Sequence, residues 1–343
     1  GSGNSILGGS GQLIKGFIST RPSSLASKNS SILAGKSNKI SGSFDCVAAG
    51  DTNRIYESSG SAAVAGASTF IKESDLSMIG CGQTNSIRES YSSFVGGGFA
   101  NRVSGTTHAA VLCGTGNHID DYTPSNLVSQ YSFIGGGHAH HIDSSKSAGI
   151  LCGAENEIQQ SVSASIAGGG AHEIIKSSYA SIGGGINGLI YLSTYSYIGA
   201  GQNNEITGRS DSAIVAGINN KASGHNSYIF GGTGNTINLS FLTGSSTEDL
   251  SKGFQFFDRG YENYNTIING ENNVIGSNKA SEMHTIHNNV NLTKTTIEGV
   301  QNKNSHIFGG EENSIDGIGG TILNGRRNDI HATTHSMYKK LLF

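Results

Sequence analysis

Phe94-Val-Gly-Gly-Gly-Phe-Ala-Asn-Arg-Val103 and Ser165-Ile-Ala-Gly-Gly-Gly-Ala-His-Glu-Ile174 are two copies of one ten-residue motif. The shared pattern is x-Ile-x-small-Gly-x-x-Asn-x-Ile, and its 17 copies start at residues 5, 31, 46, 62, 78, 94, 110, 133, 149, 165, 181, 197, 213, 228, 266, 306 and 321. The fifth position is Gly in all 17 copies and the eighth is Asn in 12. A fixed period of this kind indicates a chain built from one repeated structural unit.

Each unit is predicted to contain two short strands separated by turns. Positions two and four lie on one face of an extended segment, because strand side chains alternate. Gly at position five suits a positive φ or a close backbone approach. Asn at position eight suits a turn or a stacked hydrogen-bonded ladder. We therefore predict an all-β fold, a repetitive parallel β-roll or β-solenoid with coils of 15–16 residues.

The repeat divides the chain into five segments. They are an entry segment with the first coil (1–30), a regular β-roll (31–237), an aromatic-rich insertion (238–265), a less regular β-roll (266–330) and a C-terminal cap (331–343). Within the fourth segment, residues 276–305 read as two imperfect coils.

The small size of the coil suggests self-association. A coil of this length has little interior, so we expect its isoleucines to stay partly exposed in a single chain. Solenoid units bury their apolar faces against neighbours. The simplest way to complete that burial is a homotrimer, in which three chains pack side by side.

The run Ser-Ile-Gly-Gly-Gly-x-x-Asn-x-Ile, with serine-rich spacers, resembles the head repeat of YadA-like trimeric autotransporter adhesins. It is similar also to β-roll segments of phage tail fibres and of mosaic adhesive trimers from predatory bacteria. The resemblance covers about residues 4–237 continuously and 266–330 in part. It implies left-handed coils packed about a threefold axis, in an extracellular or cell-surface fibre or, alternatively, a virion tail. The repeat departs from the adhesin pattern in its longer coil and in its Asn.

The insertion carries the candidate ligand-binding residues. Five aromatics fall within eleven residues of a chain that is 7% aromatic. The candidates are Phe254, Phe256, Phe257, Asp258, Arg259, Tyr261, Glu262 and Tyr264. Two interpretations stay open, a platform that contacts carbohydrate or a receptor, and a plug that packs where the roll changes geometry.

Cysteine and histidine offer only weak candidate sites. Cys81, Cys113 and Cys152 all occupy position four, where we expect buried small side chains. His138, His140 and His141 are the weak metal candidates, because His138 and His140 share a face of an extended segment. His140 also stands where other units have Asn, which favours a structural role. No cofactor is expected.

The composition of the chain argues against several classes of function. The formal charge is 22 − 25 = −3 without a basic patch, so nucleic acid is not an expected partner. No membrane span is expected, since no apolar run approaches about 18 residues. We expect a non-enzymatic trimeric fibre or adhesin segment whose partners are itself and a cell-surface glycan or envelope protein. The alternatives are a phage tail-fibre or tailspike domain and a small β-helix carbohydrate-active enzyme, with Asp258 and Glu262, or Glu311 and Glu312, as weak catalytic candidates.

Overall fold

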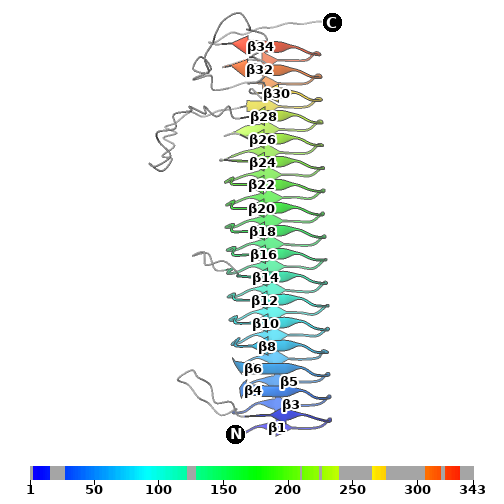
Figure 1. Cartoon of the computed structure of the whole chain (residues 1–343), viewed down its shortest axis with the longest axis vertical. Coiled ribbons are helices and arrows are strands. Elements are labelled where there is room, and N and C mark those ends of the chain that lie inside the picture. The colour runs from blue at the N-terminus through cyan, green and yellow to red at the C-terminus, as the bar shows by residue number, and fades with distance from the viewer. Residues whose placement is uncertain are drawn as a thin grey trace, which may run out of the picture. The chain divides into compact units, whose positions relative to one another are not determined.

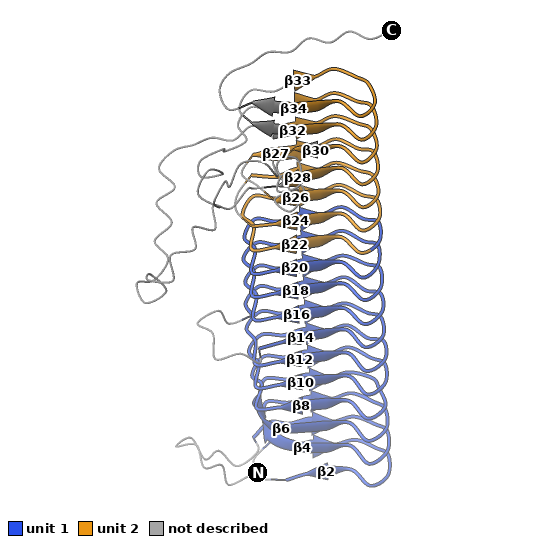
Figure 2. Cartoon of the chain, turned by 45° about the horizontal axis from the view of Figure 1, so that its top comes forward, with its two compact units in different colours: residues 1–186 blue, residues 187–343 orange. Residues whose placement is uncertain are grey.

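The computed structural model describes residues 3–15, 28–121, 129–208, 211–223, 226–238, 265–275, 306–317 and 321–332. Two compact units, residues 1–186 and 187–343, divide the chain (Figure 2). In each unit, coils of about 16 residues stack so that their strands form two parallel sheets, as the β-solenoid prediction requires (Figure 1). Within each unit, odd-numbered strands form one sheet and even-numbered strands form the other.

Every repeat start found in the sequence is the first or second residue of an odd-numbered strand. In unit 1 these strands are β1 (Ser5–Ile6), β3 (Ser31–Ile32), β5 (Cys46–Val47), β7 (Ala62–Ala63), β9 (Met78–Ile79), β11 (Phe94–Val95), β13 (Ala110–Val111), β15 (Phe133–Ile134), β17 (Gly149–Ile150), β19 (Ser165–Ile166) and β21 (Ser181–Ile182). In unit 2 they are β23 (Tyr197–Ile198), β25 (Ala213–Ile214), β27 (Ser227–Ile229), β29 (Asn265–Ile267), β31 (His306–Ile307) and β33 (Thr321–Ile322).

The even-numbered strands begin one residue before the repeat's tenth position. In unit 1 they are β2 (Leu13–Ile14), β4 (Lys39–Ser43), β6 (Arg54–Ser59), β8 (Phe70–Lys72), β10 (Ser86–Arg88), β12 (Arg102–Ser104), β14 (His118–Asp120), β16 (His141–Asp143), β18 (Glu157–Gln159) and β20 (Glu173–Ile175). In unit 2 they are β22 (Leu189–Tyr191), β24 (Glu205–Thr207), β26 (Lys221–Ser223), β28 (Thr236–Asn238), β30 (Val274–Ile275), β32 (Ser314–Gly317) and β34 (Asp329–Ala332).

The hydrophobic core lies inside each single coil. Ile at positions two and ten stacks on the equivalent residue of the next coil, as in the pairs Ile150↔Ile166 and Ile158↔Ile174. These four isoleucines are 0% exposed in the isolated chain. The expectation that the isoleucines stay partly exposed is therefore wrong. Because the two strands of a coil face each other, each coil closes over its own apolar side chains.

An asparagine ladder stabilises the turn that joins the two strands of a coil. Asn101 is fully buried, and its amide nitrogen donates to the carbonyls of Gly97 at 2.8 Å and Gly114 at 2.9 Å. Its Oδ1 accepts the backbone N–H of Asn117 at 3.0 Å. The glycine at position five has a positive φ, as at Gly98 (+92°), where a Cβ would lie 2.1 Å from the Gly114 carbonyl oxygen. Both sequence arguments for this turn are confirmed.

The strands that flank residues 276–305 are direct neighbours in both sheets. β29 pairs directly with β31, and β30 pairs directly with β32. The register likewise continues from β27 to β29, with Tyr228 opposite Thr266. Residues 276–305, interpreted from the sequence as two imperfect coils, lie outside the described residues.

Candidate functional site

Each coil has two edges, and only one of them varies in length. The edge from the odd strand to the even strand, which we call the asparagine edge, is constant: the even strand always begins seven residues after the odd strand ends, as from Ile79 to Ser86. The edge from the even strand to the next odd strand is here called the serine edge, for example residues 89–93. The structural reason for the constancy is the glycine–asparagine ladder, which tolerates no change of spacing.

All four long interruptions of the repeat fall on the serine edge. In unit 1 they follow β2 and β14, and in unit 2 they follow β28 and β30. The coil rejoins without loss of register, since Ala110 pairs with Phe133 and His118 with His141 across the interruption after β14. Insertions in solenoids map to loops on one face, which is often the binding face.

A ladder of buried hydroxyls holds the serine edge between the interruptions. Ser74 accepts the backbone N–H of Ser90 at 3.1 Å, and its own hydroxyl donates to the Lys72 carbonyl at 2.7 Å. Ser90 in turn accepts the N–H of Thr106 at 3.3 Å. A hydroxyl ladder requires no single glycine, so residues beside it can change. Exposed side chains on this edge are accordingly diverse.

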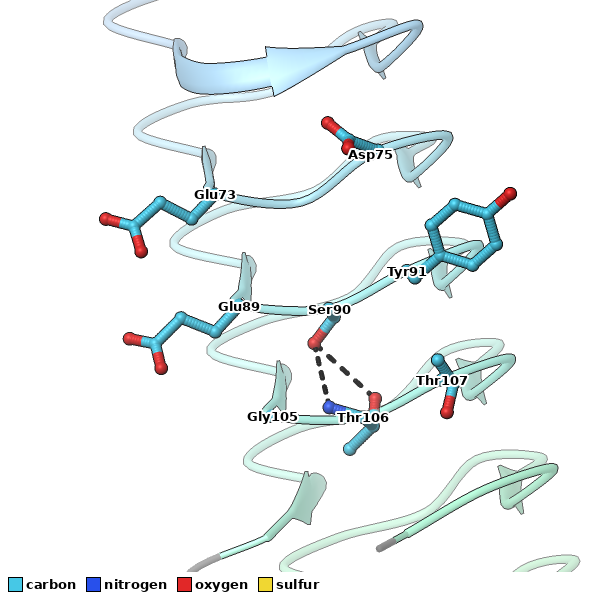
Figure 3. Close-up of a pocket in the computed structure, with 8 residues that line it drawn as sticks. All are labelled: Glu73, Asp75, Glu89, Ser90, Tyr91, Gly105, Thr106 and Thr107. Carbon is cyan, nitrogen blue, oxygen red and sulfur yellow. Dashed lines mark hydrogen bonds between the residues drawn. The ribbon is translucent and has the colours of Figure 1, made fainter. Parts of the chain in front are cut away.

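A hollow of about 240 Å³ opens on the serine edge of unit 1. Its lining includes Glu73, Asp75, Glu89, Tyr91 and Thr107, together with Ser90, Gly105 and Thr106 (Figure 3). Glu73 and Glu89 lie one above the other on one side, and Asp75 and Tyr91 lie on the opposite side (Figure 3). Asp75 accepts the backbone N–H of Ser59 at 2.8 Å, which fixes its carboxylate.

Aromatic side chains continue from this hollow along the same edge. Tyr91 and His108 meet edge to face with ring centroids 6.0 Å apart, and His108 stacks on Tyr131 at 5.1 Å. Tyr131 is 58% exposed and Tyr179, farther along unit 1, is 53% exposed. A tyrosine presents an apolar ring and a polar hydroxyl together, which suits a contact surface.

A row of charged side chains crosses the outer face of the even sheet in unit 1. Arg102, His118, His141 and Glu157 occupy equivalent places on adjacent strands. Asp120 is buried beneath them, 3.1 Å from Arg102 Nε and 3.9 Å from a ring nitrogen of each histidine. Burial raises the pKa of Asp120, against the opposing charge of Arg102. A hydrogen bond to Glu157 raises the pKa of His141, whereas burial lowers that of His118.

The three histidines named from the sequence do not converge. His138 is exposed on the asparagine edge, His140 is buried in the asparagine ladder, and His141 lies on the even sheet. The prediction that His138 and His140 share a face is wrong, because the turn between the strands separates them. Within the described ranges, no three His, Cys, Asp or Glu side chains are arranged to hold a metal ion.

The cysteines also depart from expectation. Cys81, Cys113 and Cys152 are exposed rather than buried, since position four already belongs to the turn. Each sulfur lies 3.3–3.4 Å from a carbonyl oxygen of the next coil. The sequence pattern treated positions two and four as one strand face, whereas each odd strand here ends at position two.

The remaining candidates divide into two groups. The aromatic set Phe254, Phe256, Phe257, Asp258, Arg259, Tyr261, Glu262 and Tyr264 lies outside the described residues. Glu311 and Glu312 are paired with Arg326 and Arg327 of the next coil. The hydrogen bond and charge of Arg327 lower the pKa of Glu312, so this carboxylate is a poor proton donor.

The outer face of the odd sheet carries exposed apolar side chains. In unit 2 they form a continuous row on successive coils, with Val215, Phe230, Ile268, Phe308 and Leu323 each 39–50% exposed. In unit 1, aromatic residues at position one are followed by Gly at position three. A Cβ on Gly96 would lie 3.2 Å from the Phe94 ring, and one on Gly135 would lie 3.4 Å from the Phe133 ring. The absence of a side chain at position three therefore leaves room for the aromatic ring at position one of the same coil.

Sequence reasoning missed the hollow at Glu73, Glu89 and Tyr91. The available signal was the spacing of 16 residues between Glu57, Glu73 and Glu89, which places three carboxylates at one repeat position. Tyr91 and His108 carried no such signal, because they occupy neighbouring rather than identical positions. His108 and Tyr131 occupy the same position, two residues before an odd strand, but an interruption separates them in the sequence.

Comparison with known proteins identifies no family for this chain. No protein-family model matches the chain, and no curated protein matches it significantly. None of the described segments forms a helix of the length and apolarity needed to cross a membrane.

Proposed function

We propose that this chain is a non-enzymatic fibre or adhesin segment that displays its serine edge to cell-surface glycans or envelope proteins. The observation that carries the proposal is the contrast between the two edges. The asparagine edge keeps one length in every described coil, whereas the serine edge holds all four long interruptions, the hollow and the exposed Tyr91, Tyr131, Tyr179 and Tyr195. A constant scaffold with one variable edge is the arrangement expected of a protein that presents a recognition surface.

The homotrimer belongs to the same proposal, although on a different physical basis. The isoleucines are buried within one chain and need no partner. The exposed apolar row on the odd sheet does favour a partner, because contiguous apolar patches on a soluble protein mark interaction sites. Three copies packed along this face would carry three identical serine edges, and their avidity would exceed the affinity of one edge. Left-handed coiling and an extracellular or cell-surface location follow from the adhesin resemblance.

Binding of the full chain to panels of glycans and envelope proteins tests this function. We expect at least one panel member to bind, with affinity that falls when the exposed tyrosines of the serine edge are removed. Light scattering behind size exclusion should give a mass of three times 35.5 kDa. Release of reducing sugar from a bound glycan would contradict the non-enzymatic assignment. A mass of 35.5 kDa would contradict the homotrimer.

A further inference from the structure

Two turns on the asparagine edge of unit 2 differ from the others at position four. Asn269 and Asn324 stand there, where every other copy of the repeat has Gly, Ala or Cys. Asn269 Oδ1 accepts the backbone N–H of Gly270 at 2.8 Å, and Asn324 Oδ1 accepts that of Gly325 at 2.9 Å. The carboxamide of each asparagine therefore lies against the amide nitrogen of the residue that follows it.

The backbone of the same two turns is rotated. Gly270 has a φ of +125° and Gly325 a φ of +131°. The other position-five glycines with a positive φ lie between +91° and +113°. Glycine permits this rotation because it has no Cβ. A backbone angle and a side-chain contact thus mark the same two turns independently.

Both carboxamides are open to water. Asn269 and Asn324 are exposed, and position four of the coil before each of them is a glycine. A Cβ on Gly231 would lie 3.9 Å from Asn269 Oδ1, and one on Gly309 would lie 3.8 Å from Asn324 Oδ1. The glycines therefore leave the space beside each carboxamide free for hydroxide to enter and for ammonia to leave.

We propose that Asn269 and Asn324 are sites of self-modification, at which the folded turn converts asparagine into a cyclic imide and then into a carboxylate. The amide nitrogen of Gly270 gives its proton to hydroxide and attacks Cγ of Asn269. The N–Cγ bond forms, the Cγ–Nδ2 bond breaks, and Nδ2 leaves as ammonia. Water then adds to one of the two imide carbonyl carbons, and the imide nitrogen recovers a proton. The net reaction consumes one water and releases one ammonia.

The fold contributes proximity to this reaction. An attacking atom held about 3 Å from its target in a folded chain reacts faster than one that must search for it. The hydrogen bond from Gly270 to Asn269 holds the nitrogen beside the carboxamide that it attacks. Water that adds to one imide carbonyl gives aspartate, and water that adds to the other gives isoaspartate. Isoaspartate lengthens the backbone of the asparagine edge by one atom, so it loosens a turn whose spacing is fixed.

The chain offers a matched control within itself. It has three Asn-Gly dipeptides, and each follows Ile or Leu. The third is Asn187-Gly188, at positions seven and eight. Asn187 Nδ2 donates to Asn203 Oδ1 at 3.0 Å, and Gly188 is buried. Burial shields the Gly188 nitrogen from the hydroxide that must remove its proton, so Asn187 should react slowly in the folded chain.

Peptide mass mapping of the full chain, incubated at about pH 8, tests the inference. We expect Asn269 and Asn324 to exchange ammonia for water at least tenfold faster than Asn187. In a denaturing concentration of urea, the three sites should react at similar rates, because the local sequences are alike. Equal rates in the folded chain would overturn the proposal. A rate difference that persists in urea would overturn it too, since sequence neighbours rather than the fold would then set the rate.

The Asn269→Gln/Asn324→Gln double variant separates chemistry from stability. Glutamine keeps a carboxamide but must close a six-membered ring, so both sites should stop reacting while the rate at Asn187 stays unchanged. Thermal unfolding of the variant verifies that the coil is intact. Ammonia loss at residues 269 and 324 that continues at the wild-type rate would contradict attack by the following glycine nitrogen. None of these outcomes depends on the proposed function, because the reaction needs neither a ligand nor a second chain.

Discussion

Asn101 and Asn117 are joined by a side-chain-to-backbone hydrogen bond of 3.0 Å between adjacent coils. The same Asn101 amide also donates to Gly97 of its own coil and to Gly114 of the next. One buried side chain thus satisfies three backbone groups and fixes the spacing of the asparagine edge. The serine edge is held instead by a ladder of hydroxyls, such as that of Ser145, which donates to the Asp143 carbonyl and accepts the Ser161 N–H.

Asn101→Leu should destabilise unit 1 by about 3 kcal/mol, because it leaves buried backbone groups without partners. Urea unfolding measures the free-energy difference. Asn203→Ala is a suitable control, since Asn203 is exposed and the hydrogen bonds of its amide are to the exposed side chains of Asn187 and Asn219. We expect the control to cost about 1 kcal/mol, because Ala suits the positive φ of Asn203, +52°, less well than Asn does. Similar losses in the two variants would contradict the role assigned to the ladder.

Gly98→Ala should be far more damaging than Gly116→Ala. Both glycines have a positive φ, +92° and +64°. A Cβ at Gly98 would meet the Gly114 carbonyl oxygen at 2.1 Å, whereas a Cβ at Gly116 has nothing within 4 Å. Gly116→Ala should cost about 1–2 kcal/mol from backbone conformation alone. Thermal unfolding that ranks the two variants the other way would contradict the close-approach argument.

His140→Asn should stabilise the protein selectively below about pH 6.5. Nδ1 of His140 accepts the backbone N–H of Asn156 at 3.2 Å, so the ring must be neutral. Its Nε2 faces the carbonyls of Gly153 and Gly136 without reaching hydrogen-bond geometry. Burial lowers the pKa of His140 below its ordinary value. The unfolded chain therefore binds a proton first, and stability is lost as pH falls through this window.

The difference between the His140→Asn and wild-type unfolding free energies, measured from pH 5 to 8, checks this prediction. This difference in unfolding free energy should increase as pH falls. A difference that stays constant with pH would show that His140 remains neutral in both states or is charged in both.

Asp45→Ser should have the opposite pH dependence. Burial is the main cause that raises the pKa of Asp45 from 3.8 to about 7, although the Ser61 N–H bond opposes it. The folded state then binds the extra proton, so wild-type stability falls as pH rises from about 4 to 7. Serine occupies the equivalent place at Ser61 and Ser77, where its hydroxyl accepts the N–H of the next coil.

The stabilisation by Asp45→Ser should therefore grow across this pH window, to roughly 3–4 kcal/mol above pH 7. Urea unfolding of the variant and the wild type at pH 4.5 and pH 7.5 measures it. An equal difference at the two pH values would contradict a buried, proton-linked carboxylate.

Residues 239–264 should be removable without loss of the coil. Ile229 pairs with Ile267 and Ile237 with Ile275, so the strands on either side of this segment already lie in adjacent coils. We expect a variant that keeps only a five-residue link, as between β10 and β11, to unfold within about 3 °C of the wild type. Loss of ligand binding in that variant would support the platform interpretation of Phe254–Tyr264, and retained binding would place recognition on the rest of the serine edge.

The sequence predicted the strands and the asparagine edge because both obey strict local rules. Gly at position five and Asn at position eight are required by backbone geometry within one coil and its neighbour, and this requirement is visible as a period. The burial of Ile150 and Ile166 depends instead on how two strands of one coil face each other. No local sequence pattern reports how closely the two strands of a coil approach each other. The sequence therefore predicts that the isoleucines need a partner chain.

The candidate site was less predictable for the same reason. Glu73 and Glu89 repeat at a fixed interval, but their common hollow depends on the missing side chain of Gly105. His108 and Tyr131 come together only because the coil rejoins in register across an interruption. Cys113 was assigned to a strand face that ends two residues earlier.

The most direct test of the account compares the two edges in one binding experiment. Tyr131→Ala/Tyr179→Ala removes two exposed aromatics from the serine edge, and Phe99→Ala/Ile186→Ala removes two exposed apolar residues from the asparagine edge. Affinity is measured for the tightest ligand from the glycan and envelope panels. The account predicts a loss of at least tenfold for the serine-edge variant and no change for the asparagine-edge variant. Equal affinities for the two variants, or a loss confined to the asparagine edge, would contradict recognition through the serine edge.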